Sequence, residues 1–183
     1  MTLKTDIRSR SKGDNLRIAY RHPQPAGMAP DFLVPGALNL DCDEKLWVPQ
    51  ADGVSFRPLN FNLSGGGFVN LLRVRRSGVI SRHRHGGAVH AFTLRGQWHY
   101  LEHSWMATTG SYAFEPPGET HTLVVPEGVD EMITLFHVTG NYIYVDPDGQ
   151  ALGYEDVYTK LDAARAHYTE IGLGASFVDS MIR

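Results

Sequence analysis

The chain reads GVISRHRHGGAVHAFTLRGQWHYLEHSWMATTGSYAFEPPGETH from residue 78 to residue 121. Short runs rich in Val, Phe, Tyr and Thr alternate here with turn residues such as Gly86-Gly87 and Pro116-Pro117-Gly118. Runs of this composition are typical of β-strands, and Gly and Pro mark the turns between them. The pattern continues on both sides, with further strands predicted at 53–63, 68–75, 131–138 and 141–145. Eight or nine short strands at this spacing predict an all-β fold, an antiparallel sandwich or barrel.

The composition indicates a globular protein and excludes several other classes. The chain has 183 residues, 42% of them hydrophobic, and a formal net charge of −3, which suits one globular domain. Its single cysteine, Cys42, excludes an internal disulfide and a zinc site built from cysteines. No stretch approaches the roughly 18 uninterrupted apolar residues of a membrane helix, and the charge balance is unlike that of a polyanion-binding protein. We therefore expect a cytoplasmic protein that binds neither membrane nor nucleic acid.

Three parts are expected along the chain. Residues 1–45 carry several prolines and no regular period, and we interpret them as an N-terminal arm that is partly flexible. Residues 46–150 form the barrel, and residues 151–183 form a C-terminal helix and tail that pack on the barrel or on a neighbouring subunit. The helix is predicted from apolar residues at helical spacing, namely Val157, Leu161, Ala164, Tyr168 and Ile171. We assign this helix no chemistry of its own.

Histidine is the unusual residue of this sequence. There are nine histidines against one cysteine, and five of the nine lie between residues 83 and 103. His83 and His85 are two apart in a predicted strand, so both imidazoles project from the same face. His121 follows the Pro-Pro-Gly turn at the start of another predicted strand. Imidazole nitrogens suit zinc, iron, nickel and copper alike, so these three histidines predict a metal site without choosing the metal.

Glycines and prolines at fixed spacings surround these histidines. The two patterns are Gly78-x4-His83-x-His85 with Gly96 after it, and Gly110-x5-Pro116-x-Gly118-x2-His121. Both closely resemble the two metal-binding motifs of the cupin superfamily. The resemblance implies a cupin-type antiparallel β-barrel, also described as a double-stranded β-helix or jelly roll, followed by a C-terminal α-helix.

The sequence departs from the cupin motifs where a carboxylate is expected. Most metal cupins carry glutamate at the position occupied here by Val89, and the asparagine position of the second motif is Val125. The remaining three-histidine set resembles a branch of cupin dioxygenases that cleave carbon–carbon bonds with nonhaem iron(II).

Longer stretches are similar to the 2,4'-dihydroxyacetophenone dioxygenase family. They are residues 47–49, 69–76, 81–85, 112–126, 131–136, 142–146 and 153–168. This resemblance implies Fe(II) bound by His83, His85 and His121. It also implies that an aryl hydroxyketone is cleaved with O2 to an aromatic carboxylic acid and formate.

Two further residues are candidates for a catalytic role. Glu102 shares a predicted strand face with Trp98 and Tyr100, so we expect it to act as a fourth ligand, a partner of a ligand, or a base. His90 is a second candidate for a ligand or a hydrogen-bonding group at the site, although its neighbour Val89 holds the inward position. Glu115 is interpreted as a residue that holds the turn before His121.

The sequence is also compatible with two other functions. A β-diketone such as acetylacetone chelates iron in a similar bidentate way, which makes an acetylacetone-type dioxygenase the nearest enzymatic alternative. A metal-binding cupin that senses or binds a ligand without catalysis is the other. Small barrels with a proline-rich arm and an exposed amphipathic helix commonly pair, so a homodimer or homotetramer is expected.

Overall fold

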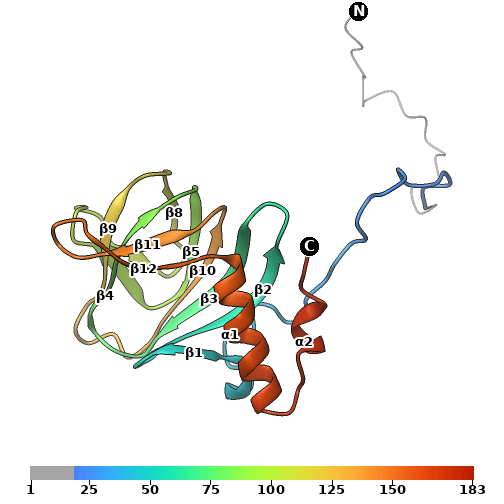
Figure 1. The fold of residues 1–183 in the computed structure, drawn as a ribbon. Coiled ribbons are helices and arrows are strands. Elements are labelled where there is room, and N and C mark those ends of the chain that lie inside the picture. The colour runs from blue at the N-terminus through green and yellow to red at the C-terminus, as the bar shows by residue number, and fades with distance from the viewer. Residues whose placement is uncertain (1–18) are drawn as a thin grey trace, which may run out of the picture. The chain divides into compact units, whose positions relative to one another are not determined.

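The computed structural model describes residues 19–183 (Figure 1). Part of the expected N-terminal arm, residues 1–18, lies outside the described residues. The chain divides into two units, Met1–Asp31 and Phe32–Arg183. In the described part of the first unit, a turn is closed by the amide of Met28 donating to the carbonyl of Pro25. The second unit contains every helix and strand discussed below.

The first sheet has the strand order β1-β2-β3-β10-β5-β8, and all of its pairings are antiparallel. Its strands are β1 (Val48–Ala51), β2 (Val54–Asn62), β3 (Gly67–Val74), β5 (Val89–Arg95), β8 (Tyr112–Glu115) and β10 (Met132–Val138).

The second sheet has the order β12-β11-β4-β9-β6-β7 and is also antiparallel. Its strands are β4 (Gly78–His85), β6 (Gln97–Tyr100), β7 (Ala107–Thr108), β9 (Thr120–Val125), β11 (Tyr142–Val145) and β12 (Ala151–Glu155). Two six-stranded antiparallel sheets confirm the all-β jelly roll that the sequence predicts.

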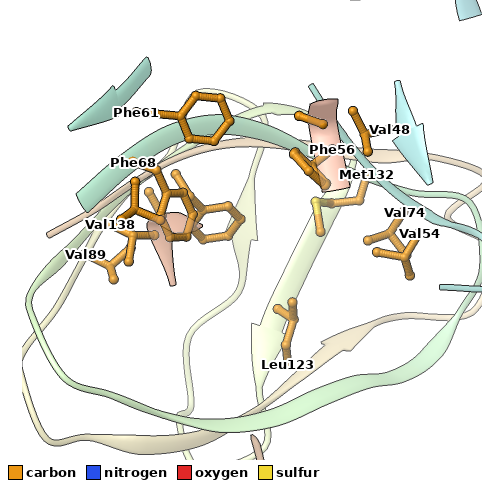
Figure 2. Packing of buried hydrophobic residues seen from close by; sticks show 14 of the residues in the cluster. Val48, Val54, Phe56, Phe61, Phe68, Val74, Val89, Leu123, Met132 and Val138 are labelled. Atoms are coloured by element: carbon orange, nitrogen blue, oxygen red, sulfur yellow. The ribbon is translucent and has the colours of Figure 1, made fainter. Parts of the chain in front are cut away.

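The hydrophobic core lies between the two sheets. Phe56, Phe68 and Met132 contribute to it from the first sheet, and Trp98 and Leu123 from the second. Figure 2 shows most of the labelled side chains gathered along the first sheet, with Leu123 standing apart from them. Each large apolar side chain that is fully buried in this way contributes roughly 1.5–3 kcal/mol of hydrophobic stabilisation.

Residues 32–46 cover the outer face of the first sheet. Val34, Ala37 and Leu40 pack there against a small buried cluster formed by Trp47, Leu59, Leu71 and Ile133. The guanidinium of Arg57 donates to the carbonyl oxygens of Gly36 and Asn39, which anchors this segment. A short 3-10 helix, η1 (Glu44–Leu46), then leads into β1. The compact unit therefore begins before residue 46, the first residue assigned to the barrel from the sequence.

The predicted C-terminal helix is confirmed as α1 (Val157–Glu170). Its N-cap, Asp156, accepts hydrogen bonds from the amides of Tyr158 and Thr159, and Thr159 returns a bond to the backbone of Asp156, which completes a capping box. The helix packs against β1, β2 and β12 (Figure 1), and the short helix α2 (Ser176–Asp179) follows it. No helix in the described part of the chain is long and apolar enough to span a membrane.

Candidate metal centre and pocket

The three predicted histidines meet inside the barrel. His83 and His85 project inward from β4, and His121 on β9 is paired directly opposite His83 in the antiparallel register. The Nε2 atoms are 3.2 Å apart for His83 and His85, 3.0 Å for His85 and His121, and 3.3 Å for His121 and His83. All three side chains are buried. Alternation along one strand and register with its neighbour therefore bring three imidazole nitrogens to one point.

The spacing of these nitrogens fits a metal ion. Imidazole ligands lie about 2.1 Å from a transition metal such as zinc, so adjacent ligands are separated by about 3.0 Å at octahedral angles and about 3.4 Å at tetrahedral angles. The observed separations of 3.0–3.3 Å fall within that range. A cation at the centre would offset the mutual repulsion of three lone pairs. The cluster can therefore hold a metal ion.

The environment keeps the imidazoles of His83 and His121 neutral, which ligation requires. Burial, and then the neighbouring His85, lower the pKa of His83 to about 3. Burial and the other histidines lower the pKa of His121 to about 2. Ser81 Oγ lies 3.0 Å from His83 Nδ1, so the proton of His83 can reside on Nδ1 and leave Nε2 free as a donor to a metal.

A fourth donor at this cluster is the carboxylate of Glu115, at the end of β8. Its Oε2 atom lies 2.9 Å from His85 Nε2 and 3.8 Å from His121 Nε2. Glu115 Oε1 accepts a hydrogen bond of 2.8 Å from the hydroxyl of Tyr100, whereas the buried Oε2 has no hydrogen bond within the described chain. A buried carboxylate oxygen is costly unless it is paired, and either a metal ion or the proton of a bound ligand would supply that pairing.

Tyr100 holds both parts of this site in place. Its ring stacks on the imidazole of His121, with 3.5 Å between ring centroids and 8° between the planes. Burial and the carboxylate of Glu115 raise its pKa well above the ordinary value for tyrosine, so the phenol remains a hydrogen-bond donor. Tyr100 therefore fixes the orientation of the His121 imidazole by stacking and the position of the Glu115 carboxylate by a hydrogen bond.

The structure places Glu102 away from the histidines. β6 ends at Tyr100, and Glu102 lies in the turn that follows, so the alternation assumed for it does not continue. Its carboxylate accepts hydrogen bonds from the amide and hydroxyl of Thr122, at 2.7 and 2.8 Å. Thr122 faces the opposite side of β9 from His121. The structure therefore brings Glu115, and not Glu102, to the three-histidine cluster.

His90 also lies outside the cluster. Its Nδ1 atom is 2.8 Å from the hydroxyl of Tyr112, and its ring stacks on that of His137. Its neighbour Val89 is fully buried and lines the pocket, so His90 takes the outer face of β5, as strand alternation requires. The sequence-predicted roles of Glu102 and His90 at the metal therefore have no support in this geometry.

The register of β5 and β8 explains why Glu115 reaches the cluster. Val89, where most metal cupins carry glutamate, is paired directly across from Glu115 in the register of β5 and β8. Directly opposed residues in an antiparallel pair project from the same face. The carboxylate that is missing from β5 is thus supplied from β8. Detecting this from the sequence would require the strand register, which no local pattern specifies.

The cluster opens into a cavity of about 540 Å³ between the sheets. Its walls are largely apolar and include Phe68, Leu72, Val89, Leu123, Phe136 and Val138. Its polar lining includes the metal cluster with Glu115 and a second group of side chains that includes Lys160 of α1. Asn70, Ser81 and Arg82 also line the cavity. A cavity of this size accommodates a small molecule with one aromatic ring, enclosed by apolar walls and oriented by a few polar groups.

The fold and the site define a cupin with a buried histidine cluster in its barrel. The model of the ChrR cupin-like domain family matches residues 36–143, and the chain belongs to that family. No curated protein sequence matches the chain.

Solved structures share this fold. An RmlC-like cupin protein from Ralstonia eutropha JMP134 is 26% identical, with a TM-score of 0.65 over 68% of this chain and 82% of that one. An acetylacetone dioxygenase from Acinetobacter johnsonii is 16% identical, with a TM-score of 0.64 over 82% of this chain and 99% of that one. A putative acetylacetone dioxygenase from Methylibium petroleiphilum PM1 is 15% identical, with a TM-score of 0.63 over 78% and 99%. At identities this low, the two dioxygenases establish a likeness of fold alone.

Proposed function

We propose that the protein is a nonhaem iron(II) dioxygenase that cleaves a carbon–carbon bond of an aryl hydroxyketone. The observation that carries the proposal is the convergence of three buried imidazoles on one side of a largely apolar cavity. Ligands on one face leave the other coordination positions open for substrate and O2, as in facial-triad oxygenases. Bound iron(II) would act as a Lewis acid toward the chelating oxygens and bring O2 next to the ketone.

The proposed reaction needs no external reductant. With 2,4'-dihydroxyacetophenone, the bond between the carbonyl carbon and the hydroxymethyl carbon breaks, and both atoms of O2 enter the products, 4-hydroxybenzoic acid and formic acid. The ketone is oxidised and O2 is reduced, so atoms and electrons balance. Each product receives one of the two oxygen atoms.

The residues of this chain supply orientation and proton transfer. The walls formed by Phe68 and Phe136 exclude water and pack against the aromatic ring. Glu115 Oε2 has no hydrogen bond in the described chain and lies beside the cluster, so it is placed to accept the proton that the hydroxyketone loses on chelation. Tyr100 holds that carboxylate through Oε1.

The test is anaerobic reconstitution with iron(II), followed by oxygen-uptake measurements and mass analysis of the products. With 18O2, we expect one labelled atom in the aromatic acid and one in formate. His83→Ala should lose both iron and oxygen uptake. His90→Ala, which alters a histidine on the outer face, is the matched control and should retain both.

The alternatives are outcomes of the same experiment. Oxygen uptake with acetylacetone but not with hydroxyacetophenones would assign β-diketone cleavage, the substrate named for the Acinetobacter johnsonii protein that shares this fold. Tight metal binding without oxygen uptake from any chelating ketone would assign a non-catalytic metal-binding cupin. The homodimer or homotetramer and the cytoplasmic location remain predictions from the sequence.

A further inference from the structure

A second polar cluster lines the same cavity at a distance from the metal ligands. Lys160 Nζ lies 2.8 Å from Glu155 Oε2 and donates a 2.7 Å hydrogen bond to Gln50 Oε1. Gln50 Nε2 donates to Glu155 Oε2 and to the hydroxyl of Tyr144, each at 3.2 Å. Tyr142 also donates its hydroxyl proton to Glu155 Oε2. We call Gln50, Tyr142, Tyr144, Glu155 and Lys160 the distal cluster.

Most of the distal cluster comes from outside the segment that matches the cupin-like family. The family model ends at residue 143, whereas Tyr144, Glu155 and Lys160 follow it. Lys160 reaches the cavity from α1, which packs against β1 and β12, the strands that carry Gln50 and Glu155. The helix that seemed from the sequence to have only a packing role therefore places a charged side chain in the pocket.

Burial of a lysine in a cavity wall is unusual and needs compensation. The side chain of Lys160 is only 2% exposed, and its ammonium lies 4.3 Å from the centre of the Phe56 ring. Glu155 supplies the opposite charge, which makes the pair neutral overall. Burial lowers the pKa of Lys160, and Glu155 opposes that effect.

The hydrogen bonds of this pair leave one donor and one acceptor unused. An ammonium has three N–H donors, and Lys160 uses two of them, on Glu155 and Gln50. The three short polar contacts of the Glu155 carboxylate, from Gln50, Tyr142 and Lys160, all go to Oε2, and Oε1 accepts no hydrogen bond within 3.5 Å among the described residues. Both side chains line the cavity. The cavity wall therefore presents an N–H donor next to a carboxylate acceptor.

Tyr142 shows how far the distal cluster lies from the metal ligands. Its ring centroid is 5.2 Å from that of His83 and 5.9 Å from that of His85, while its hydroxyl reaches Glu155. The two polar regions are thus separated by about the length of one tyrosine side chain. A ligand lying beside Tyr142 with a chelating group at the metal would place the far side of one aromatic ring at the distal cluster.

We propose that the distal cluster binds a hydroxyl group on the aromatic ring of the substrate, para to the chelating chain, and selects para-hydroxylated aryl ketones. A phenol donates to Glu155 Oε1 and accepts from the ammonium of Lys160, which matches the unused donor and acceptor. A carboxylate at the same place would be repelled by Glu155, and an unsubstituted ring would leave both groups unpaired. Lys160 is a specificity-determining residue in this scheme, which rests on the proposed function of the site.

The test compares ligand binding with and without the ring hydroxyl. Protein reconstituted with iron(II) in the absence of O2 is titrated calorimetrically with 2,4'-dihydroxyacetophenone and with 2-hydroxyacetophenone. We expect the first to bind about ten- to a hundredfold more tightly, as for hydrogen bonds to charged groups. Lys160→Met should reduce this preference to about twofold or less. Lys45→Met, which alters an exposed lysine, should leave it unchanged.

Loss of Lys160 alone leaves Glu155 without its counter-charge, so a second variant guards against misfolding. Lys160→Met combined with Glu155→Gln keeps the wall neutral and should also abolish the preference. Equal binding of the two ketones by the unmodified protein, or a preference that survives in both variants, would overturn the proposal. A clear preference in binding without oxygen consumption would support the distal site and refute the dioxygenase. Oxygen consumption combined with equal affinities for the two ketones would support the dioxygenase and refute the distal site.

Discussion

Acidification should destabilise the metal-free protein through two of its buried histidines. The folded-state pKa values of about 3 for His83 and about 2 for His121 lie below the value of about 6.5 for histidine in an unfolded chain. As the pH falls below about 6.5, the unfolded chain takes up protons that the folded chain does not. The stability contributed by these neutral histidines is therefore complete above pH 6.5 and is lost progressively toward pH 3.

The size of the effect follows from how far the pH lies below the pKa of histidine in the unfolded chain. At pH 5.0, about 1.5 pH units below the unfolded-state pKa, each of these two histidines lowers the free energy of unfolding by about 2 kcal/mol relative to pH 7.5. The two together cost about 4 kcal/mol, which is a large part of the roughly 5–15 kcal/mol by which domains are stable. For a chain of this length, the melting temperature should fall by about 8–16 °C.

The assay is thermal unfolding followed by circular dichroism between pH 7.5 and 5.0, with a chelator present. His83→Gln should remove about half of the pH-dependent loss, and His83→Gln combined with His121→Gln should remove most of it. His22→Gln, which alters an exposed histidine, is the matched control. A melting temperature that falls equally in the unmodified protein and the double variant would refute the reasoning.

Three other perturbations have expected outcomes. Removing bound metal with a chelator at pH 7.5 should lower the melting temperature. Adding iron(II) back should restore it, because free metal at a hundredfold excess over Kd raises the free energy of unfolding by about 2.7 kcal/mol. Tyr100→Phe removes the hydrogen bond that Glu115 Oε1 accepts in residues 19–183 and should lower the free energy of unfolding, measured by denaturant titration, by about 1–3 kcal/mol; an unchanged value would contradict this role. Gly96→Ala should cost more than Gly118→Ala, measured in the same way. Both glycines have positive φ, but a Cβ at Gly96 would lie 2.4 Å from the carbonyl of Glu131, whereas nothing lies within 4 Å at Gly118.

The strands and turns were predictable because their signals are local. Gly78, Gly96, Gly110 and Gly118, the fixed glycines of the two histidine patterns, all adopt positive φ in the structure. Only glycine adopts that conformation without strain, so the glycine spacing itself marks where the chain turns. The alternation of β4 likewise predicted that His83 and His85 share a face, and the structure confirms it.

The fourth polar group of the metal cluster was not predictable in the same way. Glu102 and Glu115 are both carboxylates near the motif, and alternation along a predicted strand favoured Glu102. β6 ends two residues before Glu102, whereas β8 places Glu115 across from Val89. Where a strand ends, and which strand pairs with it, depend on contacts between segments distant in sequence.

The sequence by itself determined the all-β class, the C-terminal helix and the three histidines, because strand alternation, helical period and glycine turns each act over a few residues. Only the tertiary structure decided that Glu115 completes the cluster and that Lys160 enters the cavity. Lys160 lies 110 residues from its hydrogen-bond partner Gln50. Its position follows from the docking of α1 against β1, and docking is set by the shapes of two packed surfaces rather than by any motif in the chain.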